Sequence, residues 1–364
     1  MKYLLIGDPH YRTDNRFFTS RMEQCLYQHL EINKYDAIVV LGDILDKHEN
    51  AHLVPLTEAQ DFLYNLSVFA PTYALIGNHD RINNRDYLSR YHPFTGVRNV
   101  YQLHIIDRPL WHNGAVFVPY VPENRLLETL NLTVDLTTGE PADWRQARII
   151  FCHQEINGAQ MGDKTSTIDE VWPLDAPPVY SGHIHDRQQV QANWTYVGTP
   201  FPHNFTKTEV KRTISMVDSD TNTETILNLN LPRRKLEELT VADINKRLTS
   251  KWQPDSNILY KWRITGKRAE VQRLTKQATY LTLTRGFKLE YNYTDTTIPK
   301  HALSKGSYQS YHQIVQSRLA SHPLALQYFN SLHEWAHQLT ILQLESWIIY
   351  QTTIKLFTNA SHFP

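Results

Sequence analysis

Two histidines one residue apart, His183 and His185, lie in the segment YSGHIHD, directly after the apolar run PPVY. Because alternate side chains of an extended segment point to the same side, both imidazoles would reach into one small volume while Ile184 points away. Imidazole is both a common metal ligand and a common acid/base group. The pair therefore predicts a metal site or an acid/base site, and its neighbours in space must distinguish the two.

Four more polar segments have the same setting, because each directly follows a short apolar run. The runs KYLLI, DAIVVL, TYALI, ARIIF and PVY lead into GDPH, GDILD, GNHD, CHQE and SGHIH. The side chains that these segments offer are Asp8, His10, Asp43, Asn78, His79, Asp80, His153, His183 and His185. Since the set contains carboxylates and imidazoles but no thiolates, it suits a divalent ion such as manganese, iron or zinc.

The number of donors indicates two ions, because one ion that leaves room for water and substrate cannot use them all. Two ions about 4 Å apart that share a bridging carboxylate would use them. Such a pair binds a phosphate ester across both metals, generates a hydroxide nucleophile near neutral pH and stabilises the in-line transition state. We therefore predict a binuclear metal site in which His183 and His185 serve different ions.

The elements that must position these side chains follow from the apolar runs, which we interpret as strands. Helical stretches lie between the early ones, at residues 19–34 and 57–70, and the second opens with TEAQ, a Thr-x-x-Gln capping box. Strands that alternate with helices imply a largely buried sheet with parallel pairs, whose sites lie off the carboxyl ends of the strands. All five polar segments are at such ends.

The five segments, in this order, resemble the five-block signature of the calcineurin-like metallophosphoesterases over residues 1–230. The resemblance implies a four-layer α/β fold, a β-sandwich flanked by helices. It also implies two ligand sets: Asp8, His10, Asp43 and His185 for one ion, and Asp43, Asn78, His153 and His183 for the other. The catalytic residues that it implies are His79, which binds no metal and protonates the leaving oxygen, and Asp80, which orients His79 through its second nitrogen.

The pattern changes from residue 231. LPRRK looks like a linker, TVADINKRL and KRAEVQRLTKQA like helices, and ILYKWRITG and GFKLEYNYT like strands. We therefore expect three parts: a nuclease domain at 1–230, a small α+β capping, DNA-binding domain at 231–299, and a helical tail at 300–364. Within the first part, Asp46, His48 and His203 are loop residues that could approach the substrate, and Lys207, Lys211 and Arg212 are expected on the solvated surface.

Three branches of the family compete. Protein Ser/Thr phosphatases carry GDxVDRG and GNHE, and Lys47 and Asp80 depart from both motifs. Phosphodiesterases of small nucleotides usually end near the last metal block, which would leave residues 231–364 unexplained. The order of domains resembles the SbcD-type nuclease subunits of double-strand-break processing complexes, including phage and viral versions.

The SbcD-type branch implies a DNA exonuclease and endonuclease with two divalent ions, manganese first and iron, zinc or magnesium as alternatives. It also implies a homodimer and an SbcC-type ATPase partner that binds the tail. A stand-alone phosphodiesterase of small nucleotides and a phosphoesterase-fold scaffold remain the alternatives.

Composition agrees with a globular protein and excludes few functions. The chain has 364 residues, of which 41% are hydrophobic and 20% charged, and a formal net charge of zero. No global basic field therefore attracts nucleic acid, although a local basic patch would suffice. The two cysteines have no metal-type spacing and indicate a reducing compartment. The first residues read as a strand and not as a signal peptide, and no apolar run approaches about 18 residues, so we expect a soluble cytoplasmic protein without membrane association.

Overall fold

The computed structural model describes residues 1–48, 52–207, 212–250, 252–295, 326–327 and 329–331. The chain divides into two units, Met1–Asp295 and Thr296–Pro364. The described residues of the second unit are helical, and the rest of the predicted tail lies outside the described residues. In the described part of the chain, no helix is both long enough and apolar enough to cross a membrane.

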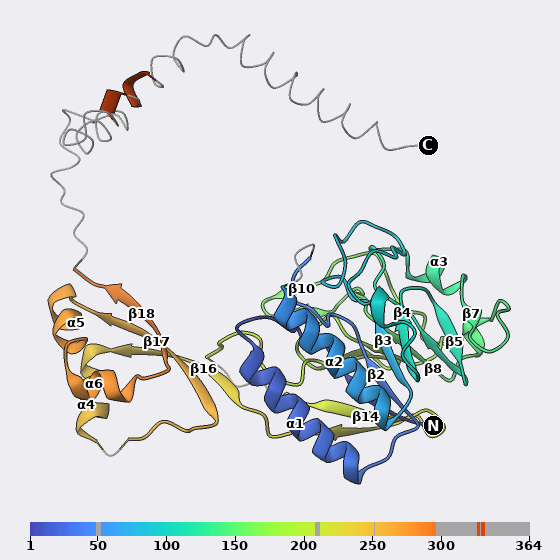
Figure 1. The fold of residues 1–364 in the computed structure, drawn as a ribbon, viewed down its shortest axis with the longest axis horizontal. Helices are drawn as coiled ribbons and strands as arrows, with labels where there is room; N and C mark the ends of the chain where they lie inside the picture. The colour runs from blue at the N-terminus through green and yellow to red at the C-terminus, as the bar shows by residue number, and fades with distance from the viewer. Residues whose placement is uncertain (49–51, 208–211, 251, 296–325, 328, 332–364) are drawn as a thin grey trace. The chain divides into compact units, whose positions relative to one another are not determined.

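The first sheet has the strand order β15-β14-β1-β2-β3-β4 (Figure 1). Strands β1 (Lys2–Ile6), β2 (Ala37–Val40), β3 (Thr72–Leu75) and β4 (Leu103–Ile106) are parallel to their neighbours. The hairpin of β14 (Ile214–Asp218) and β15 (Thr223–Leu227) joins β1 in antiparallel orientation. Helix α1 (Arg16–Ile32) connects β1 to β2, and α2 (Leu53–Phe69) connects β2 to β3.

The second sheet has the order β12-β13-β11-β8-β6-β5-β7. Its strands are β5 (Leu110–His112), β6 (Ala115–Phe117), β7 (Val134–Asp135), β8 (Ile149–Cys152), β11 (Val179–Ser181), β12 (Gln188–Gln191) and β13 (Trp194–Tyr196). The shorter elements are the helix α3 (Leu126–Leu130), the 3-10 helices Thr95–Val97 and Trp144–Gln146, and the hairpin of β9 (Gln160–Met161) and β10 (Lys164–Thr165); Thr95–Val97 packs near β4 of the first sheet.

Alternation along the strands explains how the layers pack. In β1, Leu4 and Ile6 belong to a core shared with α1 and α2, whereas Tyr3 and Leu5 belong to a core shared with the second sheet. Tyr3 packs against Phe151 of β8 with their ring centroids 4.9 Å apart. Because successive side chains point to opposite faces, an all-apolar strand fills both cores. The predicted α/β fold, with sheets flanked by helices, is confirmed.

A third, separate sheet is formed by β16 (Arg233–Thr240), β17 (Ile258–Gly266) and β18 (Lys288–Tyr293), all parallel. Helices α4 (Val241–Thr249), α5 (Arg268–Leu274) and α6 (Ala278–Leu283) connect them and share a core with them around Trp262. The prediction of a linker at LPRRK is wrong, because its last three residues begin β16 and pair with β17. The charged residues of this segment resemble a solvated linker, but they belong to a strand whose second residue, Arg234, is buried.

The two early helices begin before their predicted starts, α1 at Arg16 and α2 at Leu53. Thr57 and Gln60 consequently lie inside α2 and do not form the predicted capping box, and the N-cap position is held by His52. Pro55 lies in the first turn, where a residue without an N–H is tolerated because that group has no helical partner. The proline therefore does not delay the start of the helix.

Candidate metal centre

The five polar segments meet at one place, where parallel strands of both sheets end. Asp8, Asp43 and Asn78 follow β1, β2 and β3 of the first sheet, and the histidines His153, His183 and His185 follow β8 and β11 of the second. Each sheet supplies part of the donor set because its parallel strands end on the same side. The structure brings all seven predicted metal ligands into or beside this cluster.

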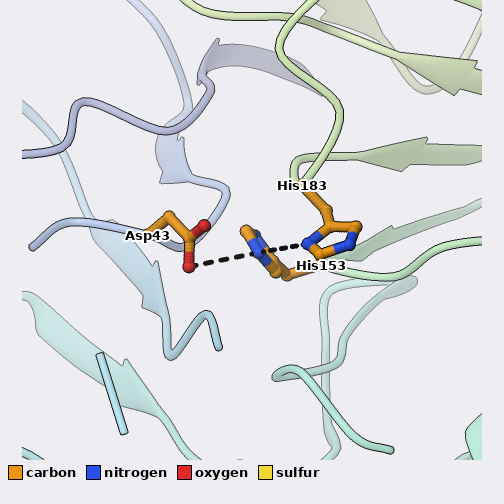
Figure 2. A group of neighbouring side chains, drawn as sticks. All are labelled: Asp43, His153 and His183. Atoms are coloured by element: carbon orange, nitrogen blue, oxygen red, sulfur yellow. Dashed lines mark hydrogen bonds and ion pairs between the residues drawn. The ribbon is translucent and has the colours of Figure 1, made fainter. Parts of the chain in front are cut away.

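The first group of donor atoms surrounds His153. Its Nε2 lies 3.0 Å from Asn78 Oδ1, 3.3 Å from Asp43 Oδ1 and 3.3 Å from His183 Nδ1. Figure 2 shows how Asp43 and His183 approach His153 from opposite sides. One potential ligand atom of each of these three residues lies within 4.8 Å of the others. This group has the composition and spacing of a site for one divalent ion.

The second group lies on the other side of Asp43. His10 Nε2 is 3.1 Å from His185 Nε2 and 3.7 Å from Asp43 Oδ2. The two oxygens of Asp43 thus face different groups of histidines, as a bridging carboxylate would. Two ring nitrogens at this distance can share one proton, and a cation between such donors would satisfy both.

Asp8 supplies the observation that tests whether a cation fits. Its Oδ1 accepts a hydrogen bond from the backbone N–H of His183 at 3.1 Å. Its Oδ2 is buried and has no hydrogen-bond partner among the described residues. Because a buried carboxylate oxygen is normally paired, this oxygen requires a further positive or donor group. The donor set therefore fits divalent metal ions.

Three of the histidines have an oxygen beside the ring nitrogen that points away from the centre. His153 Nδ1 lies 2.7 Å from the carbonyl oxygen of Leu41, which can only accept, so Nδ1 carries the proton and Nε2 presents its lone pair to the site. His183 Nε2 lies 3.6 Å from Glu155 Oε2, and His10 Nδ1 lies 3.4 Å from Asp46 Oδ1. The hydrogen bond to Leu41 thus sets which nitrogen of His153 faces the centre, and the carboxylates of Glu155 and Asp46 lie beside the outer nitrogens of the other two rings.

The backbone around the donors is unusual. Asp8, His10, Asp43 and His183 have φ values of 39°, 45°, 46° and 79°, a left-handed region that costs non-glycine residues of order 1–3 kcal/mol each. Glycine precedes Asp43 and His183 for a steric reason: a Cβ at Gly42 would lie 2.4 Å from His153 Nδ1, and one at Gly182 would lie 2.3 Å from the Leu41 carbonyl oxygen. The Gly-Asp and Gly-His pairs of the sequence thus permit close packing of the loops.

Burial and mutual proximity shift the pKa values of the cluster. Burial raises the pKa of Asp8 to about 7, although His153 opposes the shift. Burial alone would lower the pKa of His153, but the carboxylates of Asp43 and Asp8 raise it to about 9. Burial lowers the pKa of His185 to about 4. Without an ion, the positive charge that the buried carboxylates need is therefore supplied by a proton on His153.

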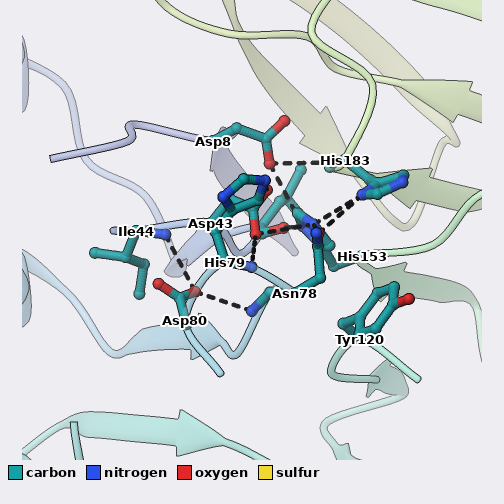
Figure 3. A network of polar contacts seen from close by, with 12 residues as sticks. Asp8, Asp43, Ile44, Asn78, His79, Asp80, Tyr120, His153 and His183 are labelled. Atoms are coloured by element: carbon teal, nitrogen blue, oxygen red, sulfur yellow. Dashed lines mark hydrogen bonds and ion pairs between the residues drawn. The ribbon is translucent and has the colours of Figure 1, made fainter. Parts of the chain in front are cut away.

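The predicted role of Asp80 in orienting His79 is wrong. His79 Nδ1 lies 2.7 Å from the backbone carbonyl oxygen of Asp46. The Asp80 carboxylate instead accepts hydrogen bonds from three backbone N–H groups, those of Ile44, Leu45 and Gly77, at 3.1, 2.8 and 2.9 Å. Figure 3 shows the bond from Ile44. Asp80 therefore connects the loop after β2 to the loop after β3 and does not touch the His79 ring. His79 itself lies at the edge of the cluster, with its side chain 34% exposed.

Several residues near the centre were not among the predicted ligands. Tyr120 follows β6, and its ring centroid lies 6.1 Å from that of His183. Its position directly after an apolar run is the feature of the sequence that could have identified it as a site residue. Glu155 belongs to the segment CHQE, so its place after a strand could also have identified it. Arg212 was expected on the solvated surface, but its side chain is largely buried. It pairs with Asp186 at 2.7 Å and donates to the carbonyl oxygen of His185. No feature of the local sequence indicates that contact.

Comparison with known proteins adds a family and several relatives. The family model described as calcineurin-like phosphoesterase matches residues 1–187. The chain is 33% identical over 301 residues to "Putative phosphoesterase 078R" of Invertebrate iridescent virus 3, covering 81% of this chain and 85% of that protein. It is 35% identical over 224 residues to "Putative phosphoesterase 244L" of Invertebrate iridescent virus 6, covering 60% and 77%. It is also 22% identical over 239 residues to a subunit of the nuclease SbcCD from Staphylococcus epidermidis, covering 59% and 64%.

Proposed function

The chain belongs to the calcineurin-like phosphoesterase family, and on that premise we propose that it hydrolyses phosphodiester bonds of DNA with two divalent metal ions. The observation that supports two ions is the position of Asp43, whose Oδ1 faces His153 and whose Oδ2 faces His10. The proposed ligand sets are the two that share Asp43: Asp8, His10, Asp43 and His185, and Asp43, Asn78, His153 and His183. Manganese is the proposed ion, with iron, zinc and magnesium as alternatives, because a mixture of imidazoles with carboxylate and amide oxygens and no thiolates suits divalent ions of this group.

The chemistry divides between the ions and the protein. When bound, the ions would supply a hydroxide nucleophile near neutral pH and balance the charge on the phosphate. His79 is the proposed acid: its Nδ1–H is held by the Asp46 carbonyl, and its Nε2 lies 4.0 Å from Asp43 Oδ2, facing the centre. The acid is the imidazolium form of His79, which carries a proton on both nitrogens: as the bond from phosphorus to the leaving oxygen breaks, Nε2 donates its proton to that oxygen and the neutral ring keeps its Nδ1–H. Tyr120 and Glu155 form the wall beside His183.

The choice of DNA as substrate rests on similarity more than on surface charge. The distant relative from Staphylococcus is named as part of a nuclease, and its alignment supports an SbcD-type role for this chain. The charges of the third sheet are largely paired, for example Arg263 with Glu238 and Lys261 with Glu290. We propose that residues 231–299 form a cap over the DNA and that residues 300–364 bind an SbcC-type ATPase in a homodimeric complex.

A substrate comparison tests the proposal. The full-length protein, loaded with Mn²⁺, is incubated with end-labelled single- and double-stranded DNA and, in parallel, with a cyclic dinucleotide and methyl p-nitrophenyl phosphate. We expect degradation of DNA that EDTA abolishes and that Mn²⁺ restores. Cleavage of the cyclic dinucleotide without cleavage of DNA would instead indicate a stand-alone phosphodiesterase of small nucleotides. A protein that binds Mn²⁺ but hydrolyses none of the four substrates would indicate a scaffold.

A further inference from the structure

A cavity of about 570 Å³ opens directly beside His79. We call it the His79 cavity; its lining includes Leu45 and Lys47 from the loop after β2, His79 and Ile82 from the loop after β3, and Arg90 and Tyr91 from the segment that follows. We propose that this cavity binds the nucleotide on the leaving side of the scissile phosphate. The inference rests on the proposed function, because it takes His79 as the group that protonates the leaving oxygen.

The position of the cavity decides which part of a substrate it can hold. His79 Nε2 lies 4.0 Å from Oδ2 of the proposed bridging ligand Asp43, and the same side chain lines the His79 cavity, so the cavity adjoins the metal cluster at His79. An oxygen that receives a proton from His79 Nε2 therefore carries its substituent toward this cavity. The volume lies within the range of about 300–1,000 Å³ that is common for small-molecule sites, so one nucleotide can enter.

The charge of the lining favours an anion. Lys47 and Arg90 are exposed, and neither forms an ion pair with a carboxylate in the described part of the chain. Arg81 adds a buried guanidinium, which donates to the backbone carbonyl oxygens of Tyr120 and Asp86. The acidic residue that also lines the cavity, Asp80, has its carboxylate occupied by three backbone N–H groups. A phosphate next to the scissile one would meet these cations.

The apolar part of the lining favours a nucleobase. Tyr91 is 61% exposed and Ile82 is 44% exposed, which is high for large apolar side chains beside a cavity. The Arg90 guanidinium lies 5.4 Å from the centre of the Tyr91 ring. An exposed aromatic ring with a neighbouring arginine is the combination on which bases stack in single-stranded nucleic acid binding. A phosphorylated protein side chain would use the cations but not this surface.

Binding without turnover is the first measurement. The probe is a fluorescein-labelled single-stranded phosphorothioate oligonucleotide, and its dissociation constant is measured by anisotropy with Mn²⁺ present. The test variants are Arg90→Gln and Tyr91→Ala. The matched controls are Arg85→Gln, an exposed arginine of the same loop, and Tyr101→Ala, a tyrosine that is 83% exposed; neither control residue lines the cavity. We expect each test variant to weaken binding about tenfold, within the range that one stacked base contributes, and the controls to stay within twofold.

Hydrolysis is the second measurement, and it separates the two proposals. Arg90→Gln and Tyr91→Ala should raise KM for an oligonucleotide but leave kcat for methyl p-nitrophenyl phosphate unchanged, because the leaving group of that substrate carries neither a phosphate nor a nucleobase. Equal oligonucleotide binding by test and control variants would overturn the proposal that the His79 cavity binds a nucleotide. If these variants still hydrolyse methyl p-nitrophenyl phosphate, the proposed phosphodiesterase activity would stand. Weakened binding by the test variants in a protein that hydrolyses neither substrate would keep the nucleotide site and reject the proposed hydrolysis.

Discussion

The Nδ1 atom of His79 lies 2.7 Å from the carbonyl oxygen of Asp46. Because a carbonyl oxygen only accepts, the contact places one proton on Nδ1 and turns Nε2 toward the metal cluster, where the imidazolium form carries the second proton that the acid role requires. The Asp46 side chain also lies 3.4 Å from His10 Nδ1 and accepts a hydrogen bond from Arg12 at 2.9 Å. One residue of the loop after β2 thus orients the proposed acid with its backbone and places its carboxylate beside a proposed ligand.

His79→Asn should separate metal binding from turnover. Since His79 lies at the edge of the cluster, the variant should retain both ions and still bind DNA. Its kcat should fall by about 10²–10⁴-fold, the usual contribution of a positioned general acid. Elemental analysis of the purified variant, together with single-turnover kinetics, provides the measurement. A variant that loses an ion would show that His79 is a ligand.

Asp80→Asn should act on stability. The amide would turn an N–H₂ group or a single oxygen toward three backbone N–H donors that now share a carboxylate. We expect the free energy of unfolding to fall by about 1–3 kcal/mol, as for a buried donor left unpaired. The control is Asp86→Asn, a change at an exposed residue in the next loop. A large loss of kcat at unchanged stability would restore a role for Asp80 in orienting His79.

Asp43→Asn should remove one ion. The substitution keeps the shape of the side chain but takes away the negative charge that would hold two cations close together. We expect one metal per chain in place of two, near-complete loss of hydrolysis and an unchanged circular dichroism spectrum. Two ions per chain with normal turnover would rule out Asp43 as the bridge.

Metal affinity should rise with pH. In the ion-free protein the pKa of His153 is raised to about 9, against the effect of burial, by Asp43 and Asp8, and the pKa of Asp8 is raised to about 7 by burial. A metal ion needs both groups deprotonated, so protons compete with it below these values. Between pH 6.5 and 8.5 the affinity for Mn²⁺ should increase up to about tenfold per pH unit for each proton released. Calorimetric titrations in buffers of different ionisation enthalpy count those protons, and a pH-independent affinity would contradict the assignment.

Arg234→Met should weaken metal binding from a distance. Arg234 of β16 is buried and donates to the Asn15 side chain and to the His203 carbonyl oxygen. Asn15 in turn donates to the backbone carbonyl oxygen of His10 at 3.2 Å. His203 Nε2 lies 2.9 Å from the backbone carbonyl oxygen of Asp8. Loss of the guanidinium leaves these buried acceptors with fewer donors, which should cost about 1–3 kcal/mol of stability.

The matched control for Arg234→Met is Arg233→Gln, at the adjacent residue, which pairs with Asp255 near the surface. We expect the Arg234 variant to bind Mn²⁺ more weakly than the Arg233 variant. If both variants bind Mn²⁺ equally well, Arg234 holds the third sheet in place without influence on the metal cluster.

The sequence by itself determined where the chemistry lies, because that information is local. Five apolar runs predict five strands, and the structure contains all five as β1, β2, β3, β8 and β11. The type of each donor and its place directly after a strand are read from single residues. Glycines next to Asp43 and His183 mark the close packing that the loops require. These features needed no knowledge of distant contacts.

Only the tertiary structure decided which atoms face one another. The two oxygens of Asp43 approach His10, which follows a strand of the first sheet, and His153, which follows a strand of the second. The His79 ring contacts the backbone carbonyl oxygen of Asp46 instead of the neighbouring Asp80 carboxylate. Every residue has a carbonyl group, so the sequence contains no sign of which one will accept a hydrogen bond. Arg234 contacts Asn15 across 219 positions of the chain, within a segment whose charges resemble a linker. Such contacts depend on how strands assemble into sheets, and local propensity does not encode that assembly.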